Sequence, residues 1–154
     1  FSWLSKKKGV NSKFIELSSK VNQARTKWIT KKIKSIANKF ENPKILLIGV
    51  SYKKNIEDTR ESASIKILEE LLRNKFLIDY CDPYNKKILL NSNNERKHLF
   101  SKKFSKALIK KYNLIVIATD HDKFDYNVIK NSKKIIIDLR GKYKNLKSKY
   151  IYQL

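Results

Sequence analysis

The 154-residue sequence contains no methionine, one cysteine, two prolines and three glycines. Because it does not begin with Met, we interpret Phe1 as an internal position of a longer protein. The lone Cys81 has no intrachain partner for a disulfide, which fits a reducing cytoplasm. No apolar run approaches the ~20 residues that cross a membrane, and no basic segment followed by an apolar stretch marks a signal peptide. We therefore expect a cytoplasmic protein without a membrane partner.

Acidic residues are scarce beside basic ones, since 36 Lys and Arg stand against 14 Asp and Glu, for a formal net charge of +22. Such a charge suggests nucleic acid or another polyanion as a partner. The basic residues are spread along the whole chain, however, and Asn and Ile are also abundant, as in any protein of an AT-rich genome. Arg, the usual reader of base edges, is rare beside Lys. We favour compositional bias and keep a basic nucleic-acid-binding α/β module as the alternative function.

The chain divides near residue 42 into a long helix and a region in which strand and helix patterns alternate. Over residues 11–40 apolar side chains recur every three or four positions, which predicts one amphipathic helix ended by Asn42-Pro43. Such a helix is on the order of 40 Å long, so part of its face should meet another domain or subunit. Residues 1–42 are assigned to this helical region and residues 43–154 to an α/β domain.

Strand and helix patterns alternate after Pro43. Strands are predicted at 44–50, 77–81, 113–119, 134–139 and 150–154, with another near 88–90 in an ambiguous polar stretch. Helices are predicted at 62–75, 100–111 and 125–131. Because this alternation requires crossover connections, we expect a Rossmann-like, mostly parallel sheet flanked by helices and preceded by the long N-terminal helix.

Ligands of an open parallel sheet bind beyond the carboxyl ends of its strands. Lys53 and Arg60 follow the first predicted strand, and Arg140 follows the strand at 134–139. A helix start near residue 62, whose free N–H groups attract anions, completes a plausible phosphate site, and Tyr52 is placed to lie against a flat ring. Only Gly49 stands where a dinucleotide fingerprint needs several glycines, so an ordinary NAD pocket is not expected.

Other chemistry-bearing residues favour structural roles. Asp58 and Glu61 have the spacing of a helix capping box. His121 lies beside two acids but near no second His or Cys, so no metal site is assigned. Cys81 ends a buried strand without a basic neighbour, which favours an inert thiol over a nucleophile. No catalytic residue is assigned in this chain.

Four segments, in order and spacing, closely resemble the C-terminal domain of the UDP-glucose/GDP-mannose dehydrogenase family. They are residues 48–62, 82–84, 118–125 and 137–141. Residues 9–22 are similar to the family's central dimerisation helix. The resemblance covers nearly the whole chain, and it implies a UDP-sugar-binding domain that forms a homodimer through its N-terminal helix.

Members of this family oxidise the C6 hydroxyl of a nucleotide sugar to a carboxylate in two NAD-dependent steps, through a thiohemiacetal and a thioester on a cysteine. The resemblance places that cysteine and the NAD-binding domain upstream of this sequence, so the chain alone is expected to be inactive. Cys81 matches no nucleophile position. The resemblance implies that Tyr52, Lys53 and Arg140 contact the UDP-sugar, and that Arg60 reaches NAD held by the other domain.

The finer resemblance is to the branch of the family that acts on UDP-N-acetylhexosamines in surface polysaccharide synthesis. Residues 119–121, Thr-Asp-His, are similar to the UDP-N-acetylglucosamine 6-dehydrogenase type, whereas the UDP-glucose branch more often has an acid followed by Trp. Residues 14–17, Phe-Ile-Glu-Leu, are also similar to the UDP-N-acetylhexosamine branch. Lys13 stands where the family usually has Arg, and residues 18–19 and 23–26 also depart from its pattern.

Overall fold

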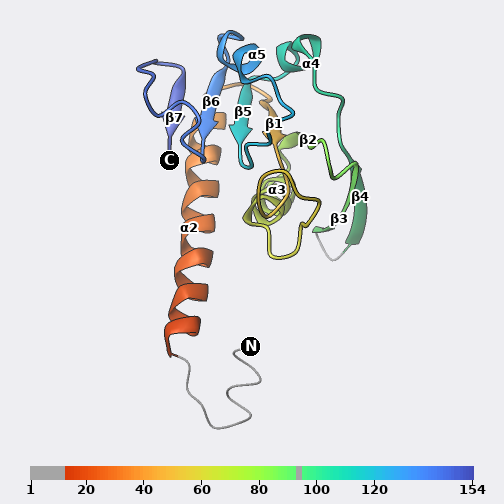
Figure 1. Cartoon of the computed structure of the whole chain (residues 1–154), viewed down its shortest axis with the longest axis vertical. Coiled ribbons are helices and arrows are strands. Elements are labelled where there is room, and N and C mark those ends of the chain that lie inside the picture. The colour runs from red at the N-terminus through yellow and green to blue at the C-terminus, as the bar shows by residue number, and fades with distance from the viewer. Residues whose placement is uncertain (1–12, 93–94) are drawn as a thin grey trace.

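The computed structural model, which describes residues 13–92 and 95–154, contains a long helix and a five-stranded sheet. The helix, α2 (Lys13–Ala37), packs on the sheet with its second half and extends well beyond it with its first (Figure 1). The predicted helix is therefore confirmed in its body, whereas its expected start at Asn11 lies outside the described residues. Within those residues, no helix combines the length and apolar character needed to cross a membrane.

The sheet has the strand order β2-β1-β5-β6-β7, and each pair of neighbours is parallel. Its strands are β1 (Lys44–Ile48), β2 (Leu77–Cys81), β5 (Leu114–Ile117), β6 (Ile135–Asp138) and β7 (Ile151–Gln153). The strand order reverses between β1 and β5, which defines the topological switch point of a doubly wound sheet. The predicted Rossmann-like class is confirmed, with the strand order of its flavodoxin-like form.

The alternation of side chains along β1 explains why its sequence is an unbroken apolar run. Ile45 and Leu47 face α2 and α3 (Ala63–Arg73), whereas Leu46 and Ile48 face α4 (Lys106–Lys110) and α5 (Tyr126–Lys130). All four side chains are fully buried. The domain is therefore a three-layer structure with one apolar core on each face of the sheet.

An antiparallel hairpin of β3 (Lys87–Ser92) and β4 (Glu95–Phe100) stands beside α3 (Figure 1). The strand expected near Ile88 is confirmed, but β4 differs from the prediction because its first residues are polar and give no strand signal. Phe100 ends this strand and does not begin a helix. The shorter helix α4 starts after Ser105, whose Oγ accepts a hydrogen bond from the Leu108 N–H at 3.0 Å.

Candidate functional site

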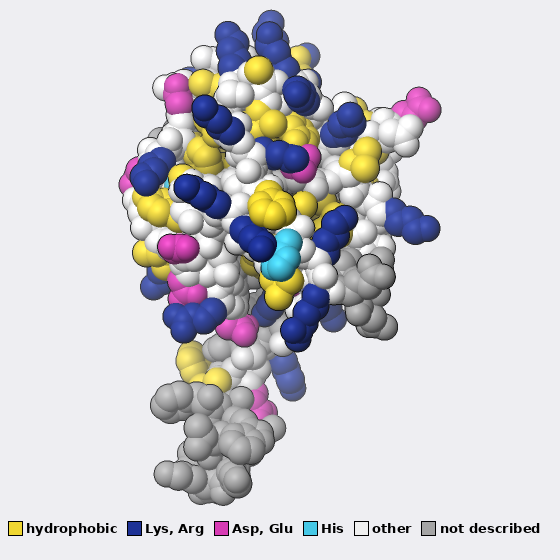
Figure 2. Space-filling view, turned by 90° about the vertical axis from the view of Figure 1, so that its right-hand side faces the viewer, with side chains coloured by type: hydrophobic (Ala, Val, Ile, Leu, Met, Phe, Trp, Pro, Cys, Tyr) yellow, Lys and Arg dark blue, Asp and Glu magenta, His cyan; other side chains and the backbone are white. Residues whose placement is uncertain are grey.

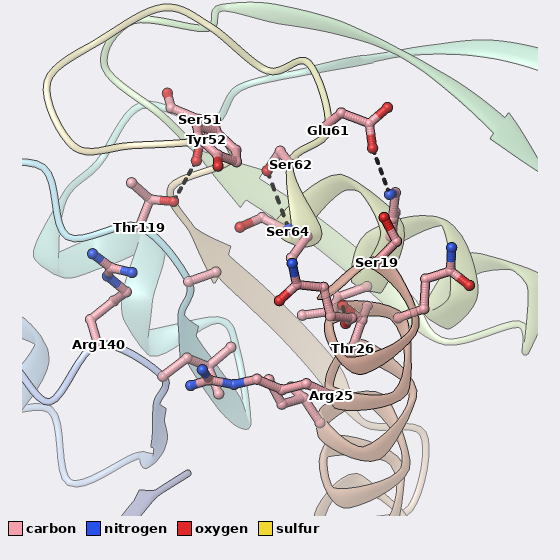
Figure 3. A pocket seen from close by; sticks show the side chains of 18 residues that line it. Ser19, Arg25, Thr26, Ser51, Tyr52, Glu61, Ser62, Ser64, Thr119 and Arg140 are labelled. Atoms are coloured by element: carbon pink, nitrogen blue, oxygen red, sulfur yellow. Dashed lines mark hydrogen bonds and ion pairs between the residues drawn. The ribbon is translucent and has the colours of Figure 1, made fainter. Parts of the chain in front are cut away.

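The carboxyl ends of the central strands lie in register and bring their following residues to one edge of the sheet. Ile48 pairs with Cys81 on one side and with Ile117 on the other, and Ile117 pairs in turn with Asp138. Residues that follow β1, β5 and β6 border a cavity of about 380 Å³. The start of α3 and the middle of α2 form its other walls (Figure 3).

Gly49 sets how closely the end of β1 approaches the end of β5. Its φ is +81°, and a Cβ at this position would overlap the carbonyl oxygen of Thr119 and lie 2.6 Å from the Thr119 Cβ. Thr119 in turn donates its N–H to the carbonyl of Ile48 at 3.1 Å. The glycine is thus required by backbone packing at the switch point.

Two of the four predicted ligand-binding residues line the cavity. Tyr52, whose side chain is 54% exposed, follows β1, and Arg140 follows β6. The Arg140 Nε donates to Asp120 Oδ1 at 3.0 Å, which uses one of the several N–H donors of the guanidinium. Buried Asp138 fixes the turn that carries Arg140, because it accepts from the Arg140 N–H at 3.0 Å and the Tyr143 N–H at 2.8 Å.

Lys53 and Arg60 are not part of the cavity lining. The Lys53 ammonium lies 5.9 Å from the centroid of the neighbouring Tyr52 ring. Arg60 forms a two-point pair with Asp58, at 3.0 and 2.9 Å, on a side chain that is 88% exposed. Both cations thus lie outside the cavity that Arg140 lines, and the ligand roles of Lys53 and Arg60 stay predictions.

The start of α3 is formed by Ser62, whose Oγ accepts from the Ser64 N–H at 3.2 Å. The predicted helix start is confirmed, but the predicted capping box is wrong. Asp58 accepts from the backbone N–H of Arg60, and Glu61 has a φ of +57° and pairs with Lys66 at 3.1 Å. Glu61 therefore belongs to the turn before the helix.

Helix α2 contributes a cation that the sequence patterns did not single out. Arg25 lines the cavity together with Arg140, and Figure 3 shows their guanidinium groups on the same side of it. Lys27 and Lys31 instead line an adjoining groove between α2 and α3. Helical periodicity identifies only the apolar face of such a helix, so a polar residue turned toward a cavity gives no sequence signal.

A buried carboxylate, Asp82, lies among the ends of β1, β2 and β5. Its Oδ2 accepts from the Val50 N–H at 2.7 Å, and its Oδ1 accepts from the N–H groups of Tyr84 and Asn85, both at 2.9 Å. Burial alone would raise the pKa of this carboxyl, but the hydrogen bonds from His121 and from these N–H groups outweigh burial and lower the pKa to about 2. Asp82 is therefore an ionised structural group.

Both nitrogens of the fully buried His121 ring are engaged. Nδ1 accepts from the Asn55 N–H at 2.9 Å, and Nε2 lies 3.0 Å from Asp82 Oδ2. Since the accepting nitrogen carries no proton, the ring is the neutral Nε2–H tautomer and donates to Asp82. Cys81 is also buried, and burial is the main cause that raises its thiol pKa to about 12, which favours the protonated thiol over the nucleophilic thiolate.

A parallel doubly wound sheet with a cation-lined cavity at its switch point defines a nucleotide-binding type of α/β domain. Residues 46–145 match the UDP-glucose/GDP-mannose dehydrogenase family, UDP binding domain. The chain belongs to this family. The segments after β1, β2, β5 and β6, which border the cavity or anchor its edge, all fall within the match.

Relatives of this chain include proteins named as nucleotide-sugar dehydrogenases. A UDP-N-acetyl-D-mannosamine dehydrogenase of Methanococcus maripaludis is 34% identical over 140 residues, or 88% of this chain and 29% of that protein. One of Methanocaldococcus jannaschii is 30% identical over 149 residues, or 90% and 32%. An NDP-N-acetyl-D-galactosaminuronic acid dehydrogenase of Ralstonia solanacearum is 26% identical over 133 residues, or 85% and 30%. The chain thus spans about a third of the length of these relatives.

Solved structures share the fold. A GDP-mannose dehydrogenase from Pseudomonas aeruginosa superposes with a TM-score of 0.75 at 17% identity, over 99% of this chain and 36% of the other. A UDP-N-acetyl-mannosamine dehydrogenase from Staphylococcus aureus gives a TM-score of 0.63 at 20% identity, over 87% and 32%. At these identities the comparison establishes the architecture, including the position of the long helix before the sheet.

Proposed function

We propose that this chain is the UDP-binding portion of a cytoplasmic, NAD-dependent nucleotide-sugar 6-dehydrogenase that oxidises a UDP-N-acetylhexosamine to the uronic acid. The observation that carries the proposal is the cavity at the switch point, where Tyr52 stands at one rim and Arg25 and Arg140 at others (Figure 3). An aromatic ring packs on a flat base or sugar, and guanidinium groups pair with a diphosphate.

The same proposal assigns Lys53 to the sugar–phosphate end of the substrate and Arg60 to NAD bound by another domain. Both residues lie in the loop after β1, are exposed to solvent and are not part of the cavity lining of this chain. The loop itself differs from a dinucleotide-binding turn, because Gly49 serves backbone packing and α3 begins only at Ala63. NAD, which accepts the hydride when bound, is therefore assigned to another part of the protein.

The names of the relatives favour an N-acetylated substrate over UDP-glucose. UDP-N-acetylmannosamine is accordingly the first substrate to test, in place of the UDP-N-acetylglucosamine suggested by residues 119–121. The corresponding uronic acid would serve surface polysaccharide synthesis. A product-forming assay needs the whole enzyme, since this chain holds no assigned nucleophile.

We further propose a homodimer through the first half of α2. Phe14, Leu17 and Val21 form an apolar stripe there, with exposed fractions of 81%, 59% and 56%, and Trp28 continues it at 48%. Phe14, Val21 and Trp28 are seven residues apart, which is the repeat of a helix that packs along a second helix. None of these stripe residues belongs to the chain's own buried core, to which α2 contributes Ile29, Ile33, Ile36 and Ala37.

The UDP assignment is tested by calorimetry of this chain with UDP, with GDP and with a short DNA duplex, each at about 50 and 200 mM salt. We expect UDP to bind in preference to GDP and to lose little affinity in the higher salt. A polyanion site would instead lose on the order of 10³-fold affinity for the duplex over this range. Tight duplex binding without heat from UDP would overturn the proposal in favour of a nucleic-acid module.

The surface charge supports UDP over nucleic acid as the partner. On the face shown in Figure 2, Lys and Arg side chains are scattered over the whole surface, with apolar and acidic side chains between them. Several cations are also neutralised locally, as Lys54 by Asp122 at 2.9 Å and Arg73 by Glu70 at 2.8 Å. A continuous basic track for a phosphate backbone is not visible on this face.

A further inference from the structure

We propose that Asp82 and His121 form a positioning clamp that holds residues 50–58 in the conformation that presents Tyr52 to the nucleotide. This inference rests on the UDP-binding function proposed above. Neither residue lines the cavity, so neither touches the ligand there. They act on it only through the loop whose backbone they hold.

The first anchor of the clamp is Ser51, the residue directly before Tyr52. Asp82 Oδ2 accepts from the Ser51 N–H at 3.3 Å and from its hydroxyl at 3.2 Å. The Ser51 Oγ accepts from Asn85 Nδ2 at 2.8 Å, and the Ser51 carbonyl accepts from the Thr119 hydroxyl at 2.7 Å. Every polar group of Ser51 is thus bound to a residue that follows β2 or β5.

The second anchor is Asn55, on the far side of Tyr52. Its N–H donates to His121 Nδ1 at 2.9 Å, and the same ring donates from Nε2 to Asp82, at 3.0 Å. The Asn55 side chain exchanges two hydrogen bonds with Asp122, at 2.6 and 3.0 Å. His121 therefore links the middle of the loop to the carboxylate that already holds its beginning.

Between the two anchors, the backbone of Tyr52 is fixed, and the residue is 54% exposed. Its N–H donates to the carbonyl of Asp58 at 2.7 Å, which closes the loop on itself. A ligand that meets a backbone already in place does not have to order it, and binding is tighter by that saving in conformational entropy. Releasing the clamp should therefore weaken UDP binding although no ligand contact is removed.

The test compares three variants of this chain. His121→Ala removes both ring hydrogen bonds, and His121→Asn places an amide oxygen near the former Nδ1 so that Asn55 keeps its acceptor. Tyr143→Phe is the matched control, because it deletes the buried hydrogen bond from the Tyr143 hydroxyl to the Tyr126 carbonyl, at 2.6 Å, away from the loop. Each variant is measured for thermal stability, for UDP affinity by calorimetry, and for amide exchange of residues 50–58 without UDP.

We expect His121→Ala to weaken UDP binding about 10-fold and to speed exchange at Asn55, His121→Asn to recover most of both, and Tyr143→Phe to lower stability alone. Equal losses of affinity in His121→Ala and Tyr143→Phe at matched stability would overturn the clamp. Unchanged loop exchange in His121→Ala would overturn it as well, whatever UDP does. If the wild-type chain binds no UDP while His121→Ala still frees the loop, the UDP function fails and the loop-holding role stands.

Discussion

The sheet edge around Asp82 and the first half of α2 differ in how their side chains are satisfied. At the sheet edge, the side-chain polar atoms of Asp82, Ser51 and His121 are buried and hydrogen-bonded within the chain. On α2, Phe14 and Val21 are apolar and mostly exposed. The sheet edge satisfies these polar groups within the chain. The first half of α2 instead exposes an apolar surface of the kind that marks interaction sites.

This difference separates two kinds of experiment. Changes at the sheet edge should lower the stability of the single chain, because buried hydrogen bonds and close backbone packing are lost. Changes on the α2 stripe should leave folding intact and alter association. A substitution that lowered folding stability and self-association equally would contradict this distinction. The variants below test the distinction, from the largest expected effect to the smallest.

Gly49→Ala should have the largest effect. The new Cβ would overlap the Thr119 carbonyl at a φ of +81°, so we expect a loss of more than about 3 kcal/mol of folding free energy, or no folded protein. Gly141→Ala is the control, since its φ is +69° but its Cβ would meet nothing closer than 3.9 Å. Chemical denaturation should show a loss of about 1 kcal/mol there. Similar losses in both variants would mean that strain, and not the strand contact, explains Gly49.

Val21→Glu should break the proposed dimer and spare the fold. Burying a carboxylate in the apolar stripe should raise the dimer dissociation constant about 100-fold, near 3 kcal/mol, while the melting temperature of the monomer stays the same. Sedimentation equilibrium measures the constant. Lys27→Glu adds an acid on a different face of α2 and should change it little. A wild-type chain that stays monomeric at high concentration would contradict the dimer.

Acid should weaken the sheet edge through Asp82. Its folded pKa of about 2 lies below the usual 3.8, so its stabilising effect is complete above about pH 5 and is lost as pH falls toward 2. The depression corresponds to about 2 kcal/mol. The free energy of unfolding, measured by chemical denaturation at pH values between 5 and 2, should fall more steeply with decreasing pH for the wild type than for Asp82→Asn. Parallel curves would show that Asp82 does not carry the acid dependence.

Arg25→Ala should weaken UDP binding about 10-fold, near 1.4 kcal/mol, because one guanidinium of the cavity is lost. The control Lys27→Ala removes the same charge from the same helix, on the wall of the neighbouring groove. Calorimetry at two salt concentrations distinguishes a direct phosphate contact from a general field effect. Equal weakening by both variants would assign the effect to net charge.

The sequence predicted those parts of the fold that depend on local apolar pattern. The strands at β1, β5 and β6 are continuous apolar runs, because both of their faces are covered, and α2 has a clear helical period. Strand β4 was missed because its polar residues are held by pairing with β3, a tertiary contact without a local signature. Helix α4 is shorter than predicted, because Phe100 pairs in strand β4 and does not belong to the helix.

The candidate site was predicted only in part. Tyr52 and Arg140 follow strand ends and so could be placed at one edge from topology alone. The pairing of Asp82 with His121, 39 residues apart, follows from strand order that no residue spacing displays. Arg25 was missed because the sequence pattern of a helix does not distinguish a cation that lines a cavity from one that is exposed to solvent. The sequence patterns therefore located the edge, and tertiary structure selected the residues that meet there.

The cavity wall and the apolar stripe share the same turns of α2. Asn22 and Arg25 line the cavity, and the stripe residues Val21 and Trp28 lie just before and just after them in the helix. A chain bound along the stripe and a ligand in the cavity would therefore restrain a single helical segment. For the proposed dimer and the proposed nucleotide site, thermodynamic linkage would make the two equilibria reciprocal, so that each would change the other by the same factor.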